Sequence, residues 1–302
     1  MRSELVAAVA ALAIVGCKSS TGVAPTDGPP ADHASPDTGG DTGMVANCPA
    51  AEDLISNFET DNALAPVDGR QGGWYTYGDM LGHFVTGGAN GFNIDGEGNV
   101  CSPNGSLHVQ GTGFGMWGAA TGVDWKPRPN DGDGGYGDKG TYNAMKYSGV
   151  SFYAKASTML GGVQISFPDI YTDGAAPRHD MPDPTDPTLP PLCTDCRCIY
   201  NAASQYNCSP YLVQFGLKGD ASADLAFANY ANVQIDTTWK RFEVHFADTK
   251  QDPGNGGYHT IANKLTVDQL TAMAIQVNAD YSTGSAKPRD FEIWLDDVAF
   301  IK

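Results

Sequence analysis

Residues 241–246 read Arg241-Phe242-Glu243-Val244-His245-Phe246, and every second side chain in this stretch is apolar. An alternation with a period of two is typical of a β-strand that buries one face and exposes the other. Further short segments of strand character are 54–58, 106–110, 149–154, 163–167, 211–217, 232–235, 272–277 and 291–301. Only residues 266–270 resemble a helical turn, with Thr266 or Asp268 as its cap. Because 37 glycines and 19 prolines supply turns between the strands, the sequence predicts an all-β fold.

The first seventeen residues resemble the signal of a bacterial lipoprotein. A short charged start precedes the apolar run 5–16, which ends as Leu12-Ala13-Ile14-Val15-Gly16-Cys17. This run is shorter than the roughly 20 residues that a membrane-spanning helix needs. The resemblance implies cleavage before Cys17 and lipidation of that cysteine. We therefore expect an exported lipoprotein, held at the outer membrane or cell surface by its lipid anchor only. An ordinary cleaved signal followed by a chance cysteine is the alternative.

The composition predicts three parts of the chain. Residues 1–16 are the signal peptide, and residues 17–47 are the lipidated cysteine with a disordered linker rich in Pro, Gly, Ser, Thr and Asp. Residues 48–302 have the size of one large β-sandwich. Within this domain, the Pro- and Cys-rich stretch at about 171–210 is predicted to be an insertion.

The chain is strongly acidic, with a formal net charge of −17. About −14 of this belongs to residues 48–302, because the signal is neutral and the linker carries four aspartates against Lys18. Such a charge repels nucleic acid and anionic lipid. It is compatible with neutral glycans or Ca²⁺ as ligands, and equally with an exported protein that has no charge-dependent partner. We expect a monomer.

Seven cysteines leave six once Cys17 is lipidated, an even number that favours disulfides in an oxidising compartment. The simplest pairing joins Cys48 to Cys101. The remaining four would pair within the insertion: Cys193, Cys196, Cys198 and Cys208. Zinc binding by these four is the alternative, although their spacing lacks the usual two pairs of closely spaced cysteines.

The chain shows no clear catalytic signature. Residues 113–118 match a GxGxxG pattern, but no amphipathic helix follows to bind phosphate. The histidines have no metalloprotease spacing, and no Gly-x-Ser-x-Gly nucleophile elbow occurs. We therefore expect a protein that is not an enzyme.

Three stretches carry a family resemblance. They are 54–59 with 69–79, 142–156, and 238–246 with 291–300. Their order and spacing resemble the galactose-binding-like jelly rolls, especially carbohydrate-binding modules of the family 11 type. The resemblance implies a two-sheet antiparallel β-sandwich (jelly roll) whose first and last strands lie together, and which binds polysaccharide. Such modules are usually joined to a catalytic domain, and we expect none within these 302 residues; the cysteine-bearing insertion is not part of their common pattern.

Aromatic side chains in Gly-rich segments are the candidate sugar-binding residues, because pyranose rings stack on Trp and Tyr. The candidates are Trp74, Tyr75, Tyr77, Trp117, Trp125, Tyr136 and Tyr142. Asp79, Asp124 and Arg128 could hydrogen-bond sugar hydroxyls. Since neighbours on a strand face opposite sides, we expect roughly half of these aromatics to be core residues. Trp239 and Trp294 lie in apolar patterns and are assigned to the core.

The resemblance also implies a structural Ca²⁺. The matching carboxylates are Glu59 and Asp296, with Asp61 and Asp297 as neighbours, and hard oxygen ligands from both ends of the domain would lock the first and last strands together. Two solvated acidic pairs are the alternative.

Three functions remain open at this stage. The leading hypothesis is non-catalytic binding of a polysaccharide or cell-surface glycan by a lipid-anchored exported protein. The second is a structural or adhesion protein without a sugar site. The third is a β-sandwich glycan hydrolase or lyase, which for hydrolysis needs two carboxylates about 5–9.5 Å apart.

Overall fold

A computed structural model gives the structure of residues 48–126, 139–173, 176, 179–180, 198–200, 204–205, 211–215, 234–251, 264–280 and 285–302. These ranges lie within the compact unit Val45–Lys302. The predicted signal and linker, and with them Cys17, lie outside the described residues. None of the helices in these ranges is both long enough and apolar enough to cross a bilayer.

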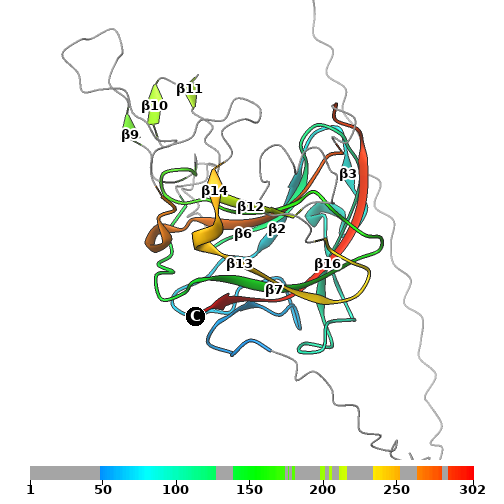
Figure 1. Cartoon of the computed structure of the whole chain (residues 1–302), viewed down its shortest axis with the longest axis horizontal. Helices are drawn as coiled ribbons and strands as arrows, with labels where there is room; N and C mark the ends of the chain where they lie inside the picture. The colour runs from blue at the N-terminus through cyan, green and yellow to red at the C-terminus, as the bar shows by residue number, and fades with distance from the viewer. Residues whose placement is uncertain are drawn as a thin grey trace, which may run out of the picture. The chain divides into compact units, whose positions relative to one another are not determined.

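The domain consists of two main antiparallel sheets that pack face to face (Figure 1). The first sheet has seven strands. Its order is β13 (Lys240–His245), β7 (Gly149–Ala156), β16 (Arg289–Ile301), β5 (Ser106–Phe114) and β3 (His83–Phe84), with β1 (Leu54–Ser56) paired to β16 and β4 (Asn93–Asp95) paired to β5.

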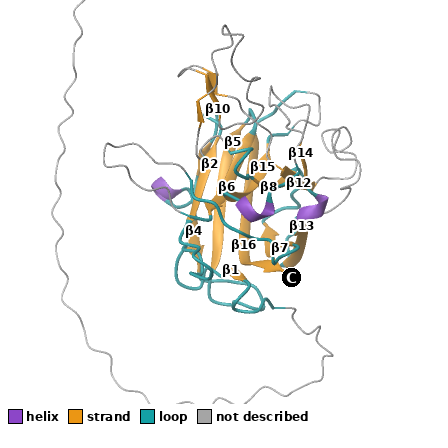
Figure 2. Cartoon of the chain, turned by 90° about the vertical axis from the view of Figure 1, so that its left-hand side faces the viewer, coloured by secondary structure: helices purple, strands orange, loops and turns teal. Residues whose placement is uncertain are grey.

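The second sheet has six strands. Its order is β14 (Lys250–Gln251), β12 (Tyr211–Phe215), β8 (Val163–Phe167), β15 (Ala272–Asn278), β6 (Gly118–Asp124) and β2 (Trp74–Gly78). Within the described ranges, the helical elements are three short 3₁₀ turns, η1 (Gly88–Asn90), η2 (Phe246–Asp248) and η3 (Val267–Gln269), drawn in purple in Figure 2. The expected all-β, two-sheet antiparallel sandwich is confirmed.

The core lies between the two sheets and is built by alternate residues of their strands. On β16, Ile293 and Leu295 point inward, and on β15 Met273 and Ile275 do the same. Each of these side chains is at most 2% exposed. The residues between them face outward, so each sheet presents a second, outer face.

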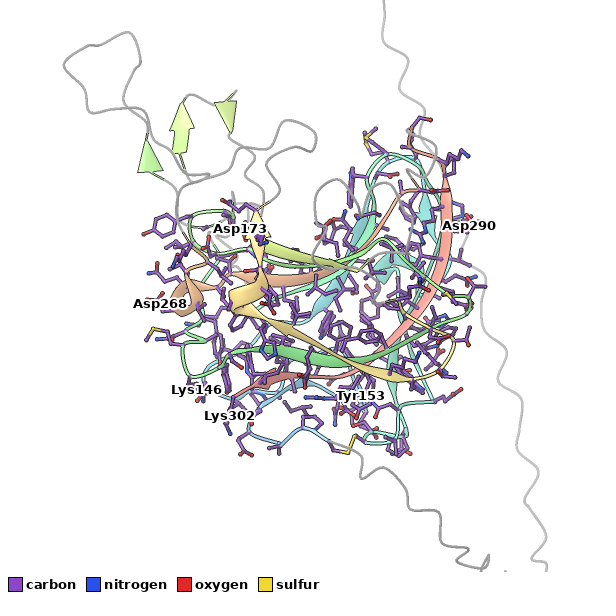
Figure 3. The ribbon with its side chains drawn as sticks, viewed as in Figure 1. Lys146, Tyr153, Asp173, Asp268, Asp290 and Lys302 are labelled. Atoms are coloured by element: carbon purple, nitrogen blue, oxygen red, sulfur yellow. A yellow bond between two sulfur atoms is a disulfide. The ribbon has the colours of Figure 1, made fainter. Side chains whose placement is uncertain are left out.

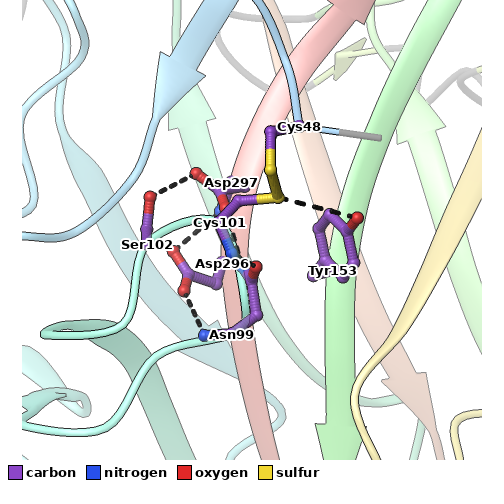
Figure 4. Close-up of a disulfide and its surroundings, with 7 residues drawn as sticks. All are labelled: Cys48, Asn99, Cys101, Ser102, Tyr153, Asp296 and Asp297. Atoms are coloured by element: carbon purple, nitrogen blue, oxygen red, sulfur yellow. Dashed lines mark hydrogen bonds between the residues drawn. A yellow bond between two sulfur atoms is a disulfide. The ribbon is translucent and has the colours of Figure 1, made fainter. Parts of the chain in front are cut away.

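The first and last strands of the domain lie together, as the resemblance implied. Strand β1 pairs with β16 in the register Leu54 to Ala299. The predicted Cys48–Cys101 disulfide is present, with the two Cα atoms 5.4 Å apart, and it lies beside this junction (Figure 4). The other predicted disulfide cysteines, Cys193, Cys196 and Cys208, lie outside the described residues, and Cys198 is described only as backbone of β10.

A separate three-stranded sheet occurs in the stretch predicted as an insertion. It consists of β9 (His179–Asp180), β10 (Cys198–Tyr200) and β11 (Ser204–Gln205). Strands β9 and β10 are parallel, unlike the antiparallel pairs of the two main sheets.

Some sequence-based expectations for individual elements were wrong. Residues 234–235 form no strand, since Ile235 makes only an isolated bridge to Leu160. Strands β2 and β6 were not expected. Strand β6 reads Gly-Ala-Ala-Thr-Gly-Val-Asp and is buried at its first six positions, so it has no polar alternation to reveal it.

The expected helical turn exists as η3, but neither proposed residue caps it through its side chain. Instead, the backbone N–H of Thr266 donates to Oδ2 of Asp169, a fully buried residue that follows β8. A distant side chain therefore supplies the cap, which local sequence could not indicate.

Candidate functional site

A row of three aromatic side chains lies on the outer face of the six-stranded sheet. Strand β2 turns Tyr75 and Tyr77 to this face, and Trp117 joins them from the turn before β6. The ring centroids of Tyr75 and Tyr77 are 5.9 Å apart, and those of Tyr77 and Trp117 are also 5.9 Å apart. Tyr77 is 40% exposed. We call Tyr75, Tyr77 and Trp117 the aromatic row.

The sheet beside the row carries small residues and then amides. Gly122 of β6 lies opposite Tyr75, and Ala120 lies opposite Tyr77. Continuing across the sheet, Ala120 pairs with Gln276 of β15, and Gln276 pairs with Gln164 of β8. Both glutamine side chains are partly exposed. The outer face thus offers hydrogen-bonding amides next to flat rings.

A short hydrogen-bond chain links these amides to each other and to the row. The Gln276 side-chain amide donates to Asn278 Oδ1 at 2.6 Å and to the Trp117 carbonyl oxygen at 3.4 Å. Asn278 in turn donates to Gln164 Oε1 at 3.4 Å. Sequence reasoning missed these three residues, although Gln276 and Asn278 stand at the polar positions of an alternating strand.

A buried charge network anchors the other end of the row. The Tyr75 hydroxyl donates to Asp124 Oδ1 at 2.9 Å, and the Lys139 Nζ atom lies 2.8 Å from the same oxygen. Lys139 is only 7% exposed. Its Nζ atom also lies 3.1 Å from Oδ2 of Asp173, which is labelled in Figure 3. The same Asp173 oxygen accepts a hydrogen bond from the Thr271 hydroxyl. Burial, followed by the Asp124 charge, raises the pKa of Tyr75, so the phenol remains a donor.

Asp79 does not face a ligand, contrary to expectation. It is 4% exposed, and its carboxylate accepts hydrogen bonds from two turns. Oδ1 accepts from the backbone of Leu81 and Gly82, and Oδ2 accepts from Met116, Trp117 and Gly118 at 2.8–3.1 Å.

This arrangement favours the ionised form of Asp79. Burial opposes ionisation, but the backbone donors outweigh it, and the pKa of Asp79 is lowered. Asp79 therefore holds Trp117 in position from beneath the surface.

Three other predicted ligand-binding residues belong to the core. Trp74 is 3% exposed, and its Nε1 donates to Ser56 Oγ at 3.0 Å. Trp125 and Tyr142 are 0% and 2% exposed and pack against Phe300. These assignments to a sugar site were wrong: the register of β2 turns Trp74 inward, and Trp125 and Tyr142, which lie outside the strands, pack into the core beside β16. Arg128 and Tyr136 lie outside the described residues.

The assignment of Trp239 and Trp294 to the core was also wrong. Both are partly exposed on the outer face of the seven-stranded sheet. The Lys155 Nζ atom lies between them, 5.1 Å from each indole centroid, and His108 stacks on Trp294 at 4.4 Å. Neighbouring side chains therefore occupy these ring faces, so this second aromatic surface is less suited to stacking on a sugar.

The predicted metal ligands are brought together only in part. Asp296 and Asp297 are 0% and 3% exposed, because a register shift in β16 and a left-handed Asp297 (φ 43°) turn both consecutive side chains away from solvent. Burial is the main cause that raises the pKa of both aspartates, and the nearby Glu59 charge acts in the same direction. Asp61 does not join them; its Oδ1 accepts a hydrogen bond from the nearby backbone of Ala63.

The hydrogen-bond partners of the two buried aspartates are shown in Figure 4. Asp296 accepts from the backbone of Asn99 at 2.9 Å and from that of Asp297 at 2.8 Å. Asp297 accepts from the Ser102 hydroxyl at 2.6 Å and from the Asn99 amide at 2.8 Å. Burial, together with the Asp297 charge, raises the pKa of Asp296 to about 8.

The chemistry of this cluster fits a hard cation, because its donors are carboxylate oxygens and a cation would take the place of the proton that burial favours on Asp296. Among the residues that the structure describes, however, no three acidic, His or Cys side chains are arranged as a metal centre. The donor atoms of the cluster are therefore of the type that Ca²⁺ prefers, but the described side chains do not form a complete set of ligands around one point.

Comparison with known proteins finds similarity in three-dimensional structure only. No protein-family model and no curated protein matches the chain. Among solved structures, the chain is similar to family 11 and family 30 carbohydrate-binding modules.

Three of these structures illustrate the likeness. The family 11 module of cellulosomal cellulase Lic26A-Cel5E of Clostridium thermocellum has 11% identity and a TM-score of 0.40, over 82% of this chain and 92% of the module. A family 11 module from the same organism, solved with a β-1,3-1,4-mixed-linked tetrasaccharide, has 9% identity and a TM-score of 0.41, over 82% and 96%. A family 30 module has 9% identity and a TM-score of 0.39, over 82% and 86%.

Proposed function

We propose that this protein binds a polysaccharide or cell-surface glycan without catalysis, on the outer face of the six-stranded sheet. The observation that supports this most directly is the aromatic row, with Tyr77 40% exposed between Tyr75 and Trp117. Flat apolar faces of pyranose rings gain contact on such side chains while the ring edges keep their hydrogen bonds. The amides of Gln164, Gln276 and Asn278 supply donors and acceptors for sugar hydroxyls.

The carboxylates beside the row support binding rather than hydrolysis. Asp79 is saturated by backbone N–H groups, and Asp124 is held by Lys139 and the Tyr75 hydroxyl. A glycosidase needs one carboxyl group that protonates the leaving group and a second that attacks or activates water. Neither of these two aspartates is free for such a role. The acidic surface also favours a neutral polymer over a phosphorylated or sulfated one.

Export with a lipid anchor and a structural Ca²⁺ complete the proposal. The resemblance of residues 1–17 to a lipoprotein signal supports export and anchoring through Cys17. A linker of about thirty residues could then extend on the order of 100 Å, which would allow the domain to reach a surface glycan.

The proposal also includes a structural Ca²⁺ at Glu59, Asp296 and Asp297. Its role would be to neutralise the buried carboxylates where β1 and β16 meet. Thermal unfolding of the purified chain in EDTA and in CaCl₂ tests this site. We expect a higher Tm in CaCl₂ and little change with MgCl₂, since Mg²⁺ demands a tighter octahedral shell. Equal Tm values in EDTA and CaCl₂ would exclude the ion.

Retention of the purified chain on a panel of insoluble and soluble β-glucans, xylans and mannans tests the glycan site. We expect retention on one polymer class, and loss of retention in Tyr77→Ala and Trp117→Ala. Trp239→Ala is the matched control, because it removes a partly exposed aromatic ring from the opposite sheet and should leave retention unchanged. A folded wild type that binds none of these polymers would favour a structural or adhesion role.

A further inference from the structure

Lys139 carries a buried amine that lies between two carboxyl groups. The residue is 7% exposed, and its Nζ atom lies 2.8 Å from Asp124 Oδ1 and 3.1 Å from Asp173 Oδ2. In every other pair of a lysine and a carboxylate within the described ranges, at least one of the two side chains is more than half exposed. Burial therefore distinguishes this contact from an ordinary surface ion pair, because it restricts the access of water to the amine and the carboxyl carbon.

The backbone fixes the three groups from separate segments of the chain. Asp124 is the last residue of β6. Lys139 lies next to the isolated antiparallel bridge between Lys126 and Gly140. Asp173 lies in the turn that follows β8, where its backbone N–H donates to the carbonyl of the residue four positions earlier at 2.9 Å. Because the fold holds the amine and the carboxyl groups in contact, their effective concentration is far above that of the same groups in solution.

Two hydroxyl groups orient the two carboxylates. The Tyr75 hydroxyl donates to Asp124 Oδ1 at 2.9 Å, and the Thr271 hydroxyl donates to Asp173 Oδ2 at 2.8 Å. Burial, followed by the Asp124 charge, raises the pKa of Tyr75, so its phenol keeps the proton that it donates. A hydrogen-bond donor therefore already lies at the oxygen that would gain negative charge if the Asp124 carboxyl carbon were attacked.

We propose that Lys139 and Asp124 become joined by an intramolecular isopeptide bond, with Asp173 as the proton carrier. The neutral amine of Lys139 attacks Cγ of Asp124, and Oδ1 takes up negative charge beside the Tyr75 hydroxyl. The bond between Cγ and Oδ2 then breaks, and an amide remains. The overall reaction converts one ammonium and one carboxylate into one amide and one water molecule, so it needs no oxidant, reductant or cofactor.

The protons balance within this cluster. The Asp173 carboxylate accepts one proton from the Lys139 ammonium and delivers it to Oδ2 of Asp124. A second proton follows from the nitrogen to the same oxygen when the amide forms, and Oδ2 leaves as water. One of the three ammonium protons stays on the amide nitrogen. Asp173 ends as the carboxylate from which it began, so the total charge of the three residues does not change.

The folded structure favours the amide for two reasons. The high effective concentration of the amine offsets the unfavourable release of water that free amines and acids would face in solution. The reaction also removes two charges from a mostly buried site, where ions are costly. The product would enclose residues 125–138 in a covalent ring and would fix the end of β6 beside Tyr75 of the aromatic row.

Peptide mapping of the purified full-length chain, reduced and denatured before digestion, tests the bond. Chymotrypsin cleaves after aromatic residues, and Trp125 and Tyr136 stand between Asp124 and Lys139 in the sequence. We expect a branched product that joins the peptide ending at Trp125 to the peptide starting after Tyr136, lighter than their sum by one water. Only linear peptides with unmodified Lys139 and Asp124, or a link from Lys139 to Asp173 instead, would overturn the proposal.

The same digest contains an internal control. Lys240 Nζ lies 2.7 Å from Asp236 Oδ2, but both side chains are at least partly exposed, and Trp239 gives a cleavage site between them. We expect the peptides of this pair to remain unlinked. A link between Lys240 and Asp236 at a similar yield would show that contact alone produces the product, and would overturn the role given to the buried cluster.

Two variants test the roles of the neighbouring groups. Asp173→Asn keeps the size of the side chain but removes the proton carrier, and it should slow bond formation by about 10²-fold or more. Tyr75→Phe keeps the ring but removes the donor to Oδ1, and it should slow the reaction by about 10²–10³-fold.

The linked fraction of each variant is measured by the same peptide mapping, at successive times after synthesis is stopped. Circular dichroism of each variant shows that it is folded, and Tyr75→Phe serves as the test if Asp173→Asn does not fold. Formation of the link at the wild-type rate in a folded variant would show that the removed group takes no part, and would overturn this mechanism.

Discussion

Trp74 and Tyr77 lie on the same short strand, β2, and face opposite sides of the six-stranded sheet. The Trp74 side chain is 3% exposed and hydrogen-bonds Ser56 in the core, whereas Tyr77 is 40% exposed and its ring lies 5.9 Å from that of Trp117 at a tilted angle. Two aromatic residues three positions apart thus have different roles, one in stability and one in the proposed glycan site.

This relationship predicts two different phenotypes. Trp74→Ala should lower the free energy of unfolding by about 3–5 kcal/mol, because it removes a buried indole. Tyr77→Ala should change stability by less than about 1 kcal/mol and abolish polysaccharide retention. Urea unfolding and a pull-down on the same two variants measure both effects. Loss of stability without loss of binding in Tyr77→Ala would contradict the site.

The Asp124–Lys139–Asp173 network predicts a large effect from a single lysine. Lys139→Met should destabilise the domain by about 3–5 kcal/mol, since two mostly buried carboxylates would lose their cation. Lys240→Met is the control, because Lys240 forms an exposed pair with Asp236 and should cost less than about 1 kcal/mol. Similar stabilities of the two variants in chemical denaturation would show that the network is not buried as described.

The Cys48–Cys101 disulfide closes a loop with a sequence separation of 53 residues. In the chain-entropy model, a loop of this size stabilises the folded state by roughly 4 kcal/mol. The double variant Cys48→Ser/Cys101→Ser should therefore unfold at a much lower denaturant concentration. Mass spectrometry of peptides from the unreduced protein checks the pairing itself, and a Cys48 peptide linked to any other cysteine would refute it.

The buried Asp296 predicts a pH dependence of stability in EDTA. Burial raises its pKa from 3.8 to about 8, so the folded state holds a proton that the unfolded state releases above its own pKa. Between pH 3.8 and about 8, the contribution of Asp296 to the free energy of unfolding should therefore be greatest at the acidic end. It should fall as the pH rises, by at most about 1.4 kcal/mol per pH unit.

The variant Asp296→Asn should flatten this dependence, because the amide does not titrate. Urea unfolding of the wild type and of Asp296→Asn at several pH values between about 4 and 8 measures how the free energy of unfolding changes with pH. A wild type whose stability rises with pH in EDTA would show that Asp296 is ionised in the folded state. Bound Ca²⁺ should also flatten the curve, since it requires the ionised carboxylates.

Much of the fold could be predicted from the sequence. The alternation in residues 241–246 identified a strand that the structure places at β13, and the apolar segment 163–167 matches β8 in both limits. Strand β6 could not be found in this way, because it is buried on both faces and composed mainly of small residues. Half-buried strands show their period in the sequence, and fully buried strands do not.

For the candidate site, the sequence could predict which aromatic residues are available but not which of them face the solvent. The sequence supplied a set of aromatic residues, and the structure divides them. Tyr75, Tyr77 and Trp117 lie on the outer face, and Trp74, Trp125 and Tyr142 lie in the core. On β2 the division depends on strand register, because a shift of one residue moves every side chain to the other face, and for the residues outside strands it depends on how the turns pack. Lys139 and Asp173 gave no signal, since they meet Asp124 only after the chain has folded.

By itself, the sequence determined the all-β class and the acidic charge, because these follow from local periodicity and composition, and it offered Cys48–Cys101 as the simplest pairing, because these two cysteines stand apart from the others. Only the tertiary structure decided which aromatic rings face outward, that Asp79 supports two turns, and that Lys139 is buried between Asp124 and Asp173. The physical reason is that burial and charge compensation are properties of side chains from distant segments, and their positions are fixed by the pairing of whole strands.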